Sequence, residues 1–519
     1  MIKTITDLVK GAIGGEPIVM PAERPEYGHY FTNIAFLTAK EARQNPREVA
    51  EEAVKKIKEL SPEGFFEKVE IAGPGFINFT LSQETLAGEL KKILKEGDKY
   101  GREEKNNPQK IQVEFISANP TGPLTFGNGR GGPFGDVLAN IFAYLGDDVT
   151  KEYYVNDAGG QVLKLGKSVL KEDGAEYKGE YIEDLRKIID ANKKEAKEAG
   201  EEAVKEVLSW LKKTVSENMG IDMDVWFSEK SLYENGTVDM VIDKLKEKGL
   251  IYEREGALWF KSTEYGDDKD RVVVKSDGEK TYFAGDMAYL WNKFAERKFN
   301  KVINIWGADH HGDVARVKGA FEALDLNGDF EILLLQFVRL LKEGKEMKMS
   351  KRKGVYVTVD EVIEEIGRDA YRFLLLMYSP DSHIDFDMNV AKEKSMENPV
   401  YYAQYAGVRA GNIIKKADEA GIAISSNIKE LNTPEDLALM FEILRFKDVI
   451  RMAGEQMKPE MLARYSLDLS KKFHAFYDKE RIVGEESNIA GQRLSLVKAS
   501  YQIFKNLFGI LGVSLPEKM

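Results

Sequence analysis

The chain of 519 residues contains no cysteine and only five histidines. The absence of cysteine excludes disulfide bridges and thiolate metal ligands, and so few histidines argue against a resident zinc ion. No apolar run reaches the ~18 residues that a membrane-spanning helix needs, and the first residues do not form a signal peptide. With 15 prolines and no low-complexity run, the composition is typical of an ordered protein. We expect a cytoplasmic protein that has no contact with a membrane and holds no metal of its own.

The chain also lacks an excess of positive charge, because 75 basic residues face 87 acidic ones and give a net charge of −12. Taken alone, this balance argues mildly against nucleic-acid binding, since affinity for phosphates depends on Lys and Arg. The charges are unevenly spread, however. Residues 342–354 contain six basic side chains and two acidic ones, whereas an acidic run occupies residues 195–206. Composition therefore leaves RNA binding open.

The length predicts two to four domains. Residues 1–105 are expected to form a small α/β domain. Within it, residues 46–60 have helical spacing, and residues 69–72 and 76–79 alternate like strands. The polar segment 96–110 is the best candidate for a linker to the next domain.

Residues 106–368 alternate between strand and helix patterns, which predicts a Rossmann-type, doubly wound α/β domain with a parallel sheet. The region around 165–270 is highly charged and is expected to be a helical insertion, with a hairpin formed by residues 258–261 and 272–275. Short apolar runs typical of buried parallel strands occupy residues 111–116, 302–306 and 331–338.

Strand patterns disappear after residue 368, so residues 369–519 are expected to form a helical bundle. Helical periodicity covers residues 369–378, 389–417, 436–452, 458–478 and 492–511. No internal repeat is present.

Residues 117–130 combine a Gly/Pro-rich turn with the start of a helical pattern at residues 132–145, directly after an expected strand. Glycines let a main chain approach a phosphate and present its N–H groups, so Gly122, Gly127 and Gly129 are candidate nucleotide contacts. Many glycine-rich turns are purely structural, so this motif alone is weak evidence.

A second, basic loop occupies residues 347–354. The ammonium groups of Lys348 and Lys351 are suited to neutralise charge on a departing pyrophosphate, and Ser350 adds a hydroxyl donor. The alternative is an ordinary solvated basic loop. A Lys-Met-Ser-Lys tetrad after an α/β pattern favours the catalytic interpretation.

The two loops together resemble the signature loops of class I aminoacyl-tRNA synthetases, and the remaining blocks resemble arginyl-tRNA synthetases in particular. The resemblance covers nearly the whole chain and implies that ATP with Mg²⁺, L-arginine and tRNA(Arg) are the substrates. It also implies that the N-terminal domain contacts the tRNA elbow and that the helical bundle reads the anticodon; we expect a monomer. The similar blocks are residues 27–33, 72–78, 117–124, 152–159, 306–312, 369–372 and 474–477.

Recognition of arginine requires a carboxylate that faces the planar guanidinium. Asp286 follows Tyr282 by four residues, so both lie on one face if residues 281–294 are helical. The resemblance implies that these two residues bind arginine.

The resemblance also assigns roles to residues at the ends of the expected strands. Ser117 and Asn119 are expected to hold the amino-acid end of arginine. Asp309 stands where many relatives have a glutamine that contacts arginine, and His310 and His311 are expected in the nucleotide pocket.

Two further assignments stay open. Glu114 is either another arginine contact or a structural carboxylate beside a buried strand. The tyrosines of the bundle either stack on unpaired tRNA bases or pack within the bundle, and packing is favoured. These tyrosines are Tyr401, Tyr402 and Tyr405.

The first loop departs from the family at two positions, because Thr125-Phe126-Gly127-Asn128 stands where the family has His-x-Gly-His. Thr125 and Asn128 can offer a hydroxyl and an amide as neutral donors, but the imidazolium charge is lost. Asn128 is also expected near the amino acid. Loss of one transition-state donor typically lowers a rate by about 10² to 10³.

Three interpretations remain from the sequence. The first and preferred one is a working arginyl-tRNA synthetase with an altered phosphate loop. The second is a non-catalytic paralogue that binds tRNA or arginine, and the third is a synthetase-like enzyme that acts on another acceptor or amino acid.

Overall fold

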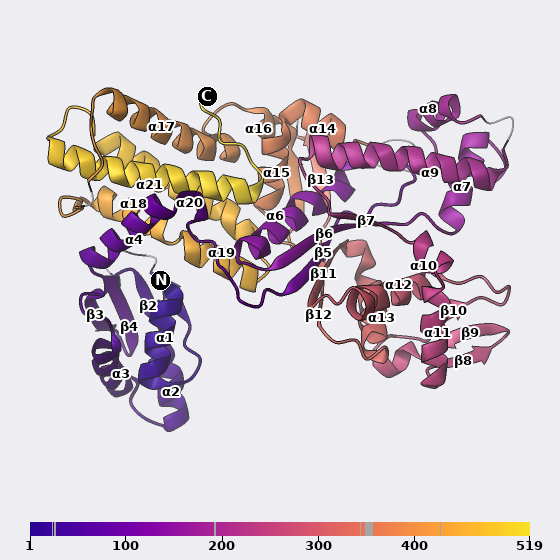
Figure 1. Cartoon of the computed structure of the whole chain (residues 1–519), viewed down its shortest axis with the longest axis horizontal. Helices are drawn as coiled ribbons and strands as arrows, with labels where there is room; N and C mark the ends of the chain where they lie inside the picture. Colours follow the sequence, from indigo (N-terminus) through magenta and orange to yellow (C-terminus); the bar gives the residue numbers. More distant parts are fainter. Residues whose placement is uncertain (23, 25–26, 191–193, 343, 348–355, 426) are drawn as a thin grey trace.

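The computed structural model describes residues 1–22, 24, 27–190, 194–342, 344–347, 356–425 and 427–519. The molecule is elongated, with a central α/β region that carries a helical bundle at one end (Figure 1). The N-terminal residues, in indigo, lie beneath that bundle, and the segments between residues 160 and 325 form the opposite end (Figure 1).

The N-terminal unit is a four-stranded antiparallel sheet covered by helices. The expected helix 46–60 is confirmed as α3, which begins at Pro46 and is capped by the side chain of Asn45. The expected strands 69–72 and 76–79 are confirmed as parts of β3 and β4. The elements are α1 (Ile2–Ile13), β1 (Val19–Pro21), β2 (Tyr30–Thr32), α2 (Ile34–Ala42), α3 (Pro46–Leu60), β3 (Phe66–Ala72), β4 (Phe76–Leu81) and α4 (Gln83–Glu96).

The centre of the molecule is a five-stranded parallel sheet in the order β12-β11-β5-β6-β7. The first strand in sequence, β5, lies in the middle of the sheet, and the chain continues to opposite sides of it. This reversal of strand order leaves a crevice at the carboxyl ends of β5 and β11, where doubly wound sheets bind ligands. The predicted fold class is confirmed. The strands are β5 (Lys110–Glu114), β6 (Asp148–Val155), β7 (Val225–Ser228), β11 (Lys301–Gly307) and β12 (Asp329–Leu335).

The region 165–270 is not only a helical insertion, as expected from its charge, because β7 within it is a strand of the central sheet. The expected hairpin is confirmed as β9 and β10, but a third antiparallel strand, β8, completes a small sheet. The elements between the central strands are α5 (Phe126–Gly129), α6 (Gly131–Tyr144), α7 (Gly160–Leu170), α8 (Glu180–Ile188), α9 (Ala196–Lys213), α10 (Lys230–Glu234), α11 (Thr237–Glu247), β8 (Ile251–Arg254), β9 (Ala257–Phe260), β10 (Arg271–Val274), α12 (Tyr282–Trp291) and α13 (His311–Ala323).

Two further expectations about strands were wrong. The run 331–338 is not one strand, since β12 ends at Leu335 and β13 (Val338–Lys342) belongs to a separate sheet. Strands also do not end at residue 368, because β15 (Ile384–Asp387) pairs in parallel with β13. This strand was missed because its four residues are too few to show a clear alternation. The same small sheet includes β14 (Lys345–Glu346).

The C-terminal helices form the expected bundle, with two of the long periodic runs broken. The run 389–417 is interrupted at residues 393–398, and its second helix begins at Pro399, which disfavours helical geometry in the preceding Asn398. The run 436–452 divides at Arg445. The helices are α14 (Val359–Ile366), α15 (Arg368–Leu376), α16 (Met388–Lys392), α17 (Pro399–Glu419), α18 (Pro434–Leu444), α19 (Phe446–Glu455), α20 (Glu460–Lys479) and α21 (Ser487–Leu511).

A buried arginine joins the bundle to the central sheet. Arg372 is fully buried and donates to the carbonyl oxygen of Leu511, the last residue of α21, at 3.0 and 3.2 Å. It also donates to the carbonyl oxygen of Met219 at 3.0 Å and pairs with Asp136 of α6. A buried charge needs such full pairing, so these contacts fix the bundle against the helix that follows the first loop. Among the described residues, no helix is both long and apolar enough to span a membrane.

Candidate active site

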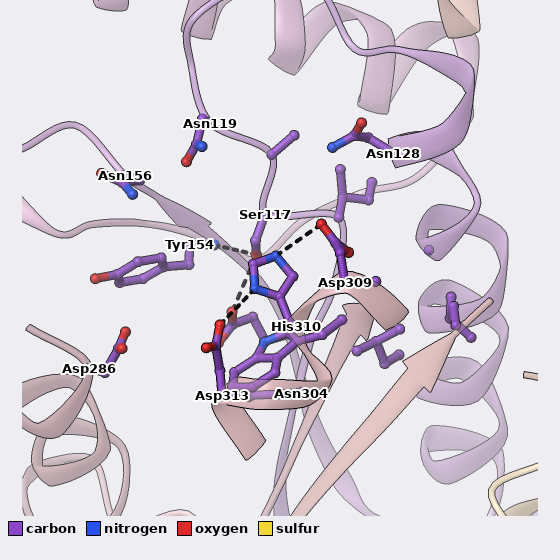
Figure 2. A pocket seen from close by; sticks show the side chains of 18 of the residues that line it. Ser117, Asn119, Asn128, Tyr154, Asn156, Asp286, Asn304, Asp309, His310 and Asp313 are labelled. Carbon is purple, nitrogen blue, oxygen red and sulfur yellow. Dashed lines mark hydrogen bonds and ion pairs between the residues drawn. The ribbon is translucent and has the colours of Figure 1, made fainter. Parts of the chain in front are cut away.

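A cavity of about 570 Å³ opens at the crevice between β5 and β11. Residues from both strand ends line it, together with the start of α5 and one face of α12 (Figure 2). The predicted residues that it brings together are Ser117, Asn119, Gly127, Asn128, Tyr282, Asp286, Asp309 and His310.

The main chain is strained where β5 enters the cavity. We expected the strand to reach residue 116, but it ends at Glu114, and Ile116 and Ser117 have φ angles of 68° and 41°. A left-handed conformation is a clear outlier for a β-branched residue. The turn lets the Ser117 hydroxyl accept the N–H of Tyr154 at 3.0 Å (Figure 2). Ser117 is thereby fixed beside the cavity, which Asn119 also lines.

One end of the cavity is acidic. Tyr282 and Asp286 lie four residues apart on α12, and both line the cavity, as the spacing predicted. The pKa of Asp286 is raised to about 7, mainly by burial; the positive charge of Arg316 opposes this rise, and the carboxylates of Asp313 and Glu114 add to it.

A second carboxylate of this end, Glu229, was missed by the sequence reasoning. It lines the cavity, is 2% exposed and follows β7 directly. Burial raises its pKa to about 8, with the charges of Asp286 and Asp157 adding to the effect. The signal in the sequence was its place directly after a parallel strand, but β7 lay within a region that was interpreted as helical.

Four buried polar atoms in this cavity have no hydrogen-bond partner among the described residues. Such atoms are costly unless a ligand or water satisfies them. They are Tyr154 Oη, Asn156 Oδ1, Glu229 Oε2 and Arg316 Nε. The three oxygens among them can accept hydrogen bonds, and together with Asp286 they suit a positively charged ligand that has several hydrogen-bond donors.

Glu114, whose role the sequence left open, forms a buried ion pair with Lys293 at 2.5 Å. Lys293 Nζ also donates to Asn304 Oδ1 of β11 at 2.9 Å. These contacts connect the two strands that flank the crevice. The geometry supports a structural role for Glu114 more directly than an arginine contact.

His310 lies between two carboxylates near the middle of the view, between Asp286 on one side and Asn128 on the other (Figure 2). Its Nδ1 lies 3.1 Å from Asp313 Oδ2, and its Nε2 lies 3.9 Å from Asp309 Oδ2. His311 begins α13 and does not line the cavity, so the structure separates the two adjacent histidines that were predicted to act together.

The rim of the cavity carries an exposed aromatic ring that the sequence reasoning also missed. Phe337 lines the cavity although 57% of it is exposed. Arg130 fixes the rim, because it donates to the carbonyl oxygens of Gln336, Ser379 and Ser382. An exposed ring at this position is suited to stack on a nucleobase.

The glycines of the first loop divide into two groups. Gly127 lines the cavity, and a Cβ atom at this position would meet no other atom within 4 Å. Gly129 does not line it, because it packs against Tyr371 and Val359 so closely that a methyl group would overlap with both. Gly122 lies against the ring of Tyr181. Gly122 and Gly129 therefore pack against other side chains, and their expected nucleotide contacts stay predictions.

Thr125 and Asn128 are bonded to each other. The Thr125 hydroxyl donates to Asn128 Oδ1 at 2.6 Å, and only Asn128 lines the cavity. The predicted catalytic residues Lys348, Ser350 and Lys351 of the basic loop lie outside the described residues. The first residue of this loop is anchored, since the N–H of Met347 donates to the carbonyl oxygen of Leu340 at 2.9 Å.

The tyrosines of α17 contact other side chains of the bundle. The Tyr401 and Tyr405 rings stack at 6.0 Å, and Tyr402 meets His474 edge-on at 4.9 Å. Arg409 lies over the Tyr405 ring at 4.6 Å. These contacts agree with the favoured packing role. The part of the chain that the structure describes contains no cluster of acidic or histidine side chains that could hold a metal ion.

A parallel sheet with a nucleotide-sized crevice, two signature loops and a C-terminal bundle define a class I aminoacyl-tRNA synthetase. Family models match nearly the whole chain. The arginyl tRNA synthetase N terminal domain matches residues 1–81, the catalytic domain of tRNA synthetases class I (R) matches residues 89–220 and 195–377, and the DALR anticodon binding domain matches residues 403–519.

Among the class I aminoacyl-tRNA synthetases, the chain is most clearly similar to enzymes specific for arginine. The arginine–tRNA ligase of Caldanaerobacter subterraneus subsp. tengcongensis is 43% identical over 96% of this chain and 93% of its own length. That of Aquifex aeolicus is 40% identical over 100% of this chain and 99% of its own. The arginyl-tRNA synthetase structure from Thermus thermophilus, 22% identical, has a TM-score of 0.80 over the full length of both chains, which supports the fold. The chain belongs to the arginyl-tRNA synthetase family.

Proposed function

We propose that this chain is an arginine–tRNA ligase, which activates L-arginine with ATP and transfers the arginyl group to tRNA(Arg). The observation that carries the proposal is the acidic end of the cavity, where the nearby cations Arg316 and Lys293 form salt bridges with Asp313 and Glu114 and leave Asp286 and Glu229 without an ion-pair partner among the described residues. A guanidinium has five N–H donors and a permanent positive charge. It would satisfy both the carboxylates and the unpartnered oxygens around them.

Arginine would then lie with its guanidinium at Asp286, Glu229 and Tyr282. Its amino-acid end would lie near Ser117 and Asn119, close to the first loop. From there the carboxylate of arginine attacks the α-phosphorus of ATP, and pyrophosphate departs. The chain contributes positioning and charge stabilisation to this step rather than a covalent intermediate.

ATP, with Mg²⁺ as part of the substrate, would occupy the other end of the cavity. Asn128 and Gly127 are placed to contact its phosphates, His310 and Asp309 line the pocket beside them, and the base can stack on Phe337. We assign stabilisation of the departing pyrophosphate to Lys348, Ser350 and Lys351, on the strength of the tetrad that they form.

The proposal divides the chain at residues 105 and 368. Residues 1–105 would contact the tRNA elbow, residues 106–368 would carry catalysis, and residues 369–519 would read the anticodon. The family matches to an N-terminal and an anticodon binding domain support the outer two assignments. We further propose that the protein acts as a cytoplasmic monomer.

The non-catalytic alternative rests on the two replaced histidines. The complete acidic end argues against a paralogue that binds only tRNA, whereas a paralogue that binds arginine would keep it and differs from the enzyme in catalysis. The decisive experiment is pyrophosphate exchange into ATP with purified full-length protein, matching tRNA and a panel of amino acids. We expect exchange that depends on both arginine and tRNA. Absence of exchange with folded protein would reject the ligase, and exchange driven by another amino acid would favour the third interpretation.

A further inference from the structure

The structure separates two residues that the sequence treated as equivalent donors. Thr125 is 6% exposed and does not line the cavity, whereas Asn128 is exposed and does. The hydroxyl of Thr125 donates to Asn128 Oδ1 at 2.6 Å. Figure 2 shows the Asn128 amide nitrogen on the side of the cavity that faces Asn119.

The main chain holds Thr125 in place on both sides. Thr125 forms an isolated β-bridge with Thr358, the N–H of Phe126 donates to the carbonyl oxygen of Val357, and the N–H of Val359 donates to that of Leu124, both at 2.9 Å. The partner segment follows the basic loop in sequence. These main-chain contacts therefore hold Thr125 of the first loop against the segment that follows the second loop.

This fixed hydroxyl decides which way the Asn128 amide points. In the observed orientation the Thr125 hydrogen is used by Oδ1, and both N–H groups of Asn128 remain available. In the flipped orientation the hydroxyl hydrogen would have no acceptor, because Asn128 is the only side chain bonded to Thr125 Oγ1 among the described residues. A buried hydroxyl without an acceptor raises the free energy of that conformation. The orientation in which the N–H₂ group of Asn128 points into the cavity is therefore favoured.

Phosphate oxygens only accept hydrogen bonds, so the orientation of this amide is chemically decisive. We propose that Thr125 is a positioning residue that orients Asn128, and that Asn128 is the neutral phosphate donor of the first loop. The pair takes over, without charge, part of the role of the two histidines. This inference rests on the proposed ligase function, since it assigns the ATP phosphates to this end of the cavity.

The test measures kcat and KM for ATP in arginine- and tRNA-dependent pyrophosphate exchange, and Mg-ATP binding by calorimetry in parallel. Asn128→Ala and Asn128→Asp remove the N–H₂ donor and are expected to lower kcat/KM by about 10². Thr125→Val removes only the hydroxyl and is expected to lower it by about 10-fold. Thr125→Ser, which keeps the hydroxyl, is expected to stay within about threefold of the wild type.

The double variant Thr125→Val/Asn128→Ala distinguishes positioning from simple structural support. If Thr125 acts through Asn128, the double variant is no slower than Asn128→Ala alone. The matched control is Thr214→Val, which removes another buried hydroxyl that donates at 2.7 Å to Asp360, outside the cavity. It is expected to leave exchange unchanged.

Two results would overturn the inference: a Thr125→Val variant equal to the wild type, or a Thr125→Val effect that persists in the Asn128→Ala background. Failure of the ligase function is a separate outcome, in which the wild type binds Mg-ATP but shows no exchange. In that case the calorimetric affinities of the same variants still decide whether Thr125 acts through Asn128.

Discussion

Replacing one carboxylate of the acidic end should change stability and substrate affinity in opposite directions. The substitution Asp286→Asn keeps the shape of the side chain and removes its charge. In the protein without arginine, this charge lies in a half-buried position next to the carboxylate of Glu229. The variant should therefore unfold at a higher temperature and bind arginine more weakly.

The stability effect follows from the pKa of Asp286, which burial raises from 3.8 to about 7. Between pH 4 and 7 the folded protein keeps a proton that the unfolded chain releases, so the free energy of unfolding falls as the pH rises through this range. One pKa unit corresponds to about 1.4 kcal/mol. The raised pKa of Asp286 therefore lowers the free energy of unfolding by about 2 kcal/mol at pH 5 and by about 4 kcal/mol at pH 8. Above pH 7 this effect changes little.

The assay compares thermal unfolding of wild type and Asp286→Asn at pH 5 and pH 8 without arginine. The gain in Tm should be clearly larger at pH 8, where several degrees are expected. Arginine binding, measured by calorimetry at pH 8, should weaken by about 10- to 100-fold, because a charge-assisted hydrogen bond is lost. Asp7→Asn, on the exposed side of α1, is the control and should change neither quantity.

The reasoning would be refuted if the Tm gain were equal at both pH values, or if the variant bound arginine as tightly as the wild type. A parallel measurement with Glu229→Gln should show the same pattern displaced to higher pH, because the pKa of Glu229 is raised to about 8.

Three further predictions concern packing, the domain junction and the nucleotide. Gly129→Ala should destabilise the protein by about 1–3 kcal/mol because the added methyl group overlaps with Tyr371 and Val359. The control Gly127→Ala meets open space and should leave the unfolding temperature unchanged. Equal effects of the two variants would contradict the packing role of Gly129. Arg372→Met should lower the free energy of unfolding by about 3–5 kcal/mol because Asp136 loses a buried partner. The control Arg339→Met, in an exposed pair with Asp385, should lower it by less than about 1 kcal/mol. Similar unfolding temperatures for the two variants would argue against a role of Arg372 in joining the bundle to the central sheet. Phe337→Ala should raise KM for ATP about tenfold through lost stacking and leave KM for arginine unchanged, and an unchanged KM for ATP would remove Phe337 from the nucleotide pocket.

Much of the fold could be predicted because the relevant patterns are local. The helix at residues 46–60 and the strands at the centre of the sheet follow from periodicity over a few residues. The strand β15 could not be found this way, because four residues carry too little pattern and its pairing with β13 is non-local. The same limit hid β7, and with it Glu229.

The candidate site was predictable where chemistry depends on spacing along one element. Tyr282 and Asp286 are four residues apart on one helix, and the structure places both in the cavity. The raised pKa of Asp286 could not be read from the chain, because burial and the neighbouring charges come from other elements.

The sequence by itself determined the doubly wound alternation, most of the helices, the two loops and the replacement of two histidines by Thr125 and Asn128, since these depend on residue type and local spacing. Only the tertiary structure decided that these two residues are unequal. Thr125 is buried against the segment that follows the basic loop, while Asn128 faces the cavity. The physical reason is that a hydrogen-bond donor acts where its free N–H points, and that direction is set by contacts between segments more than 200 residues apart.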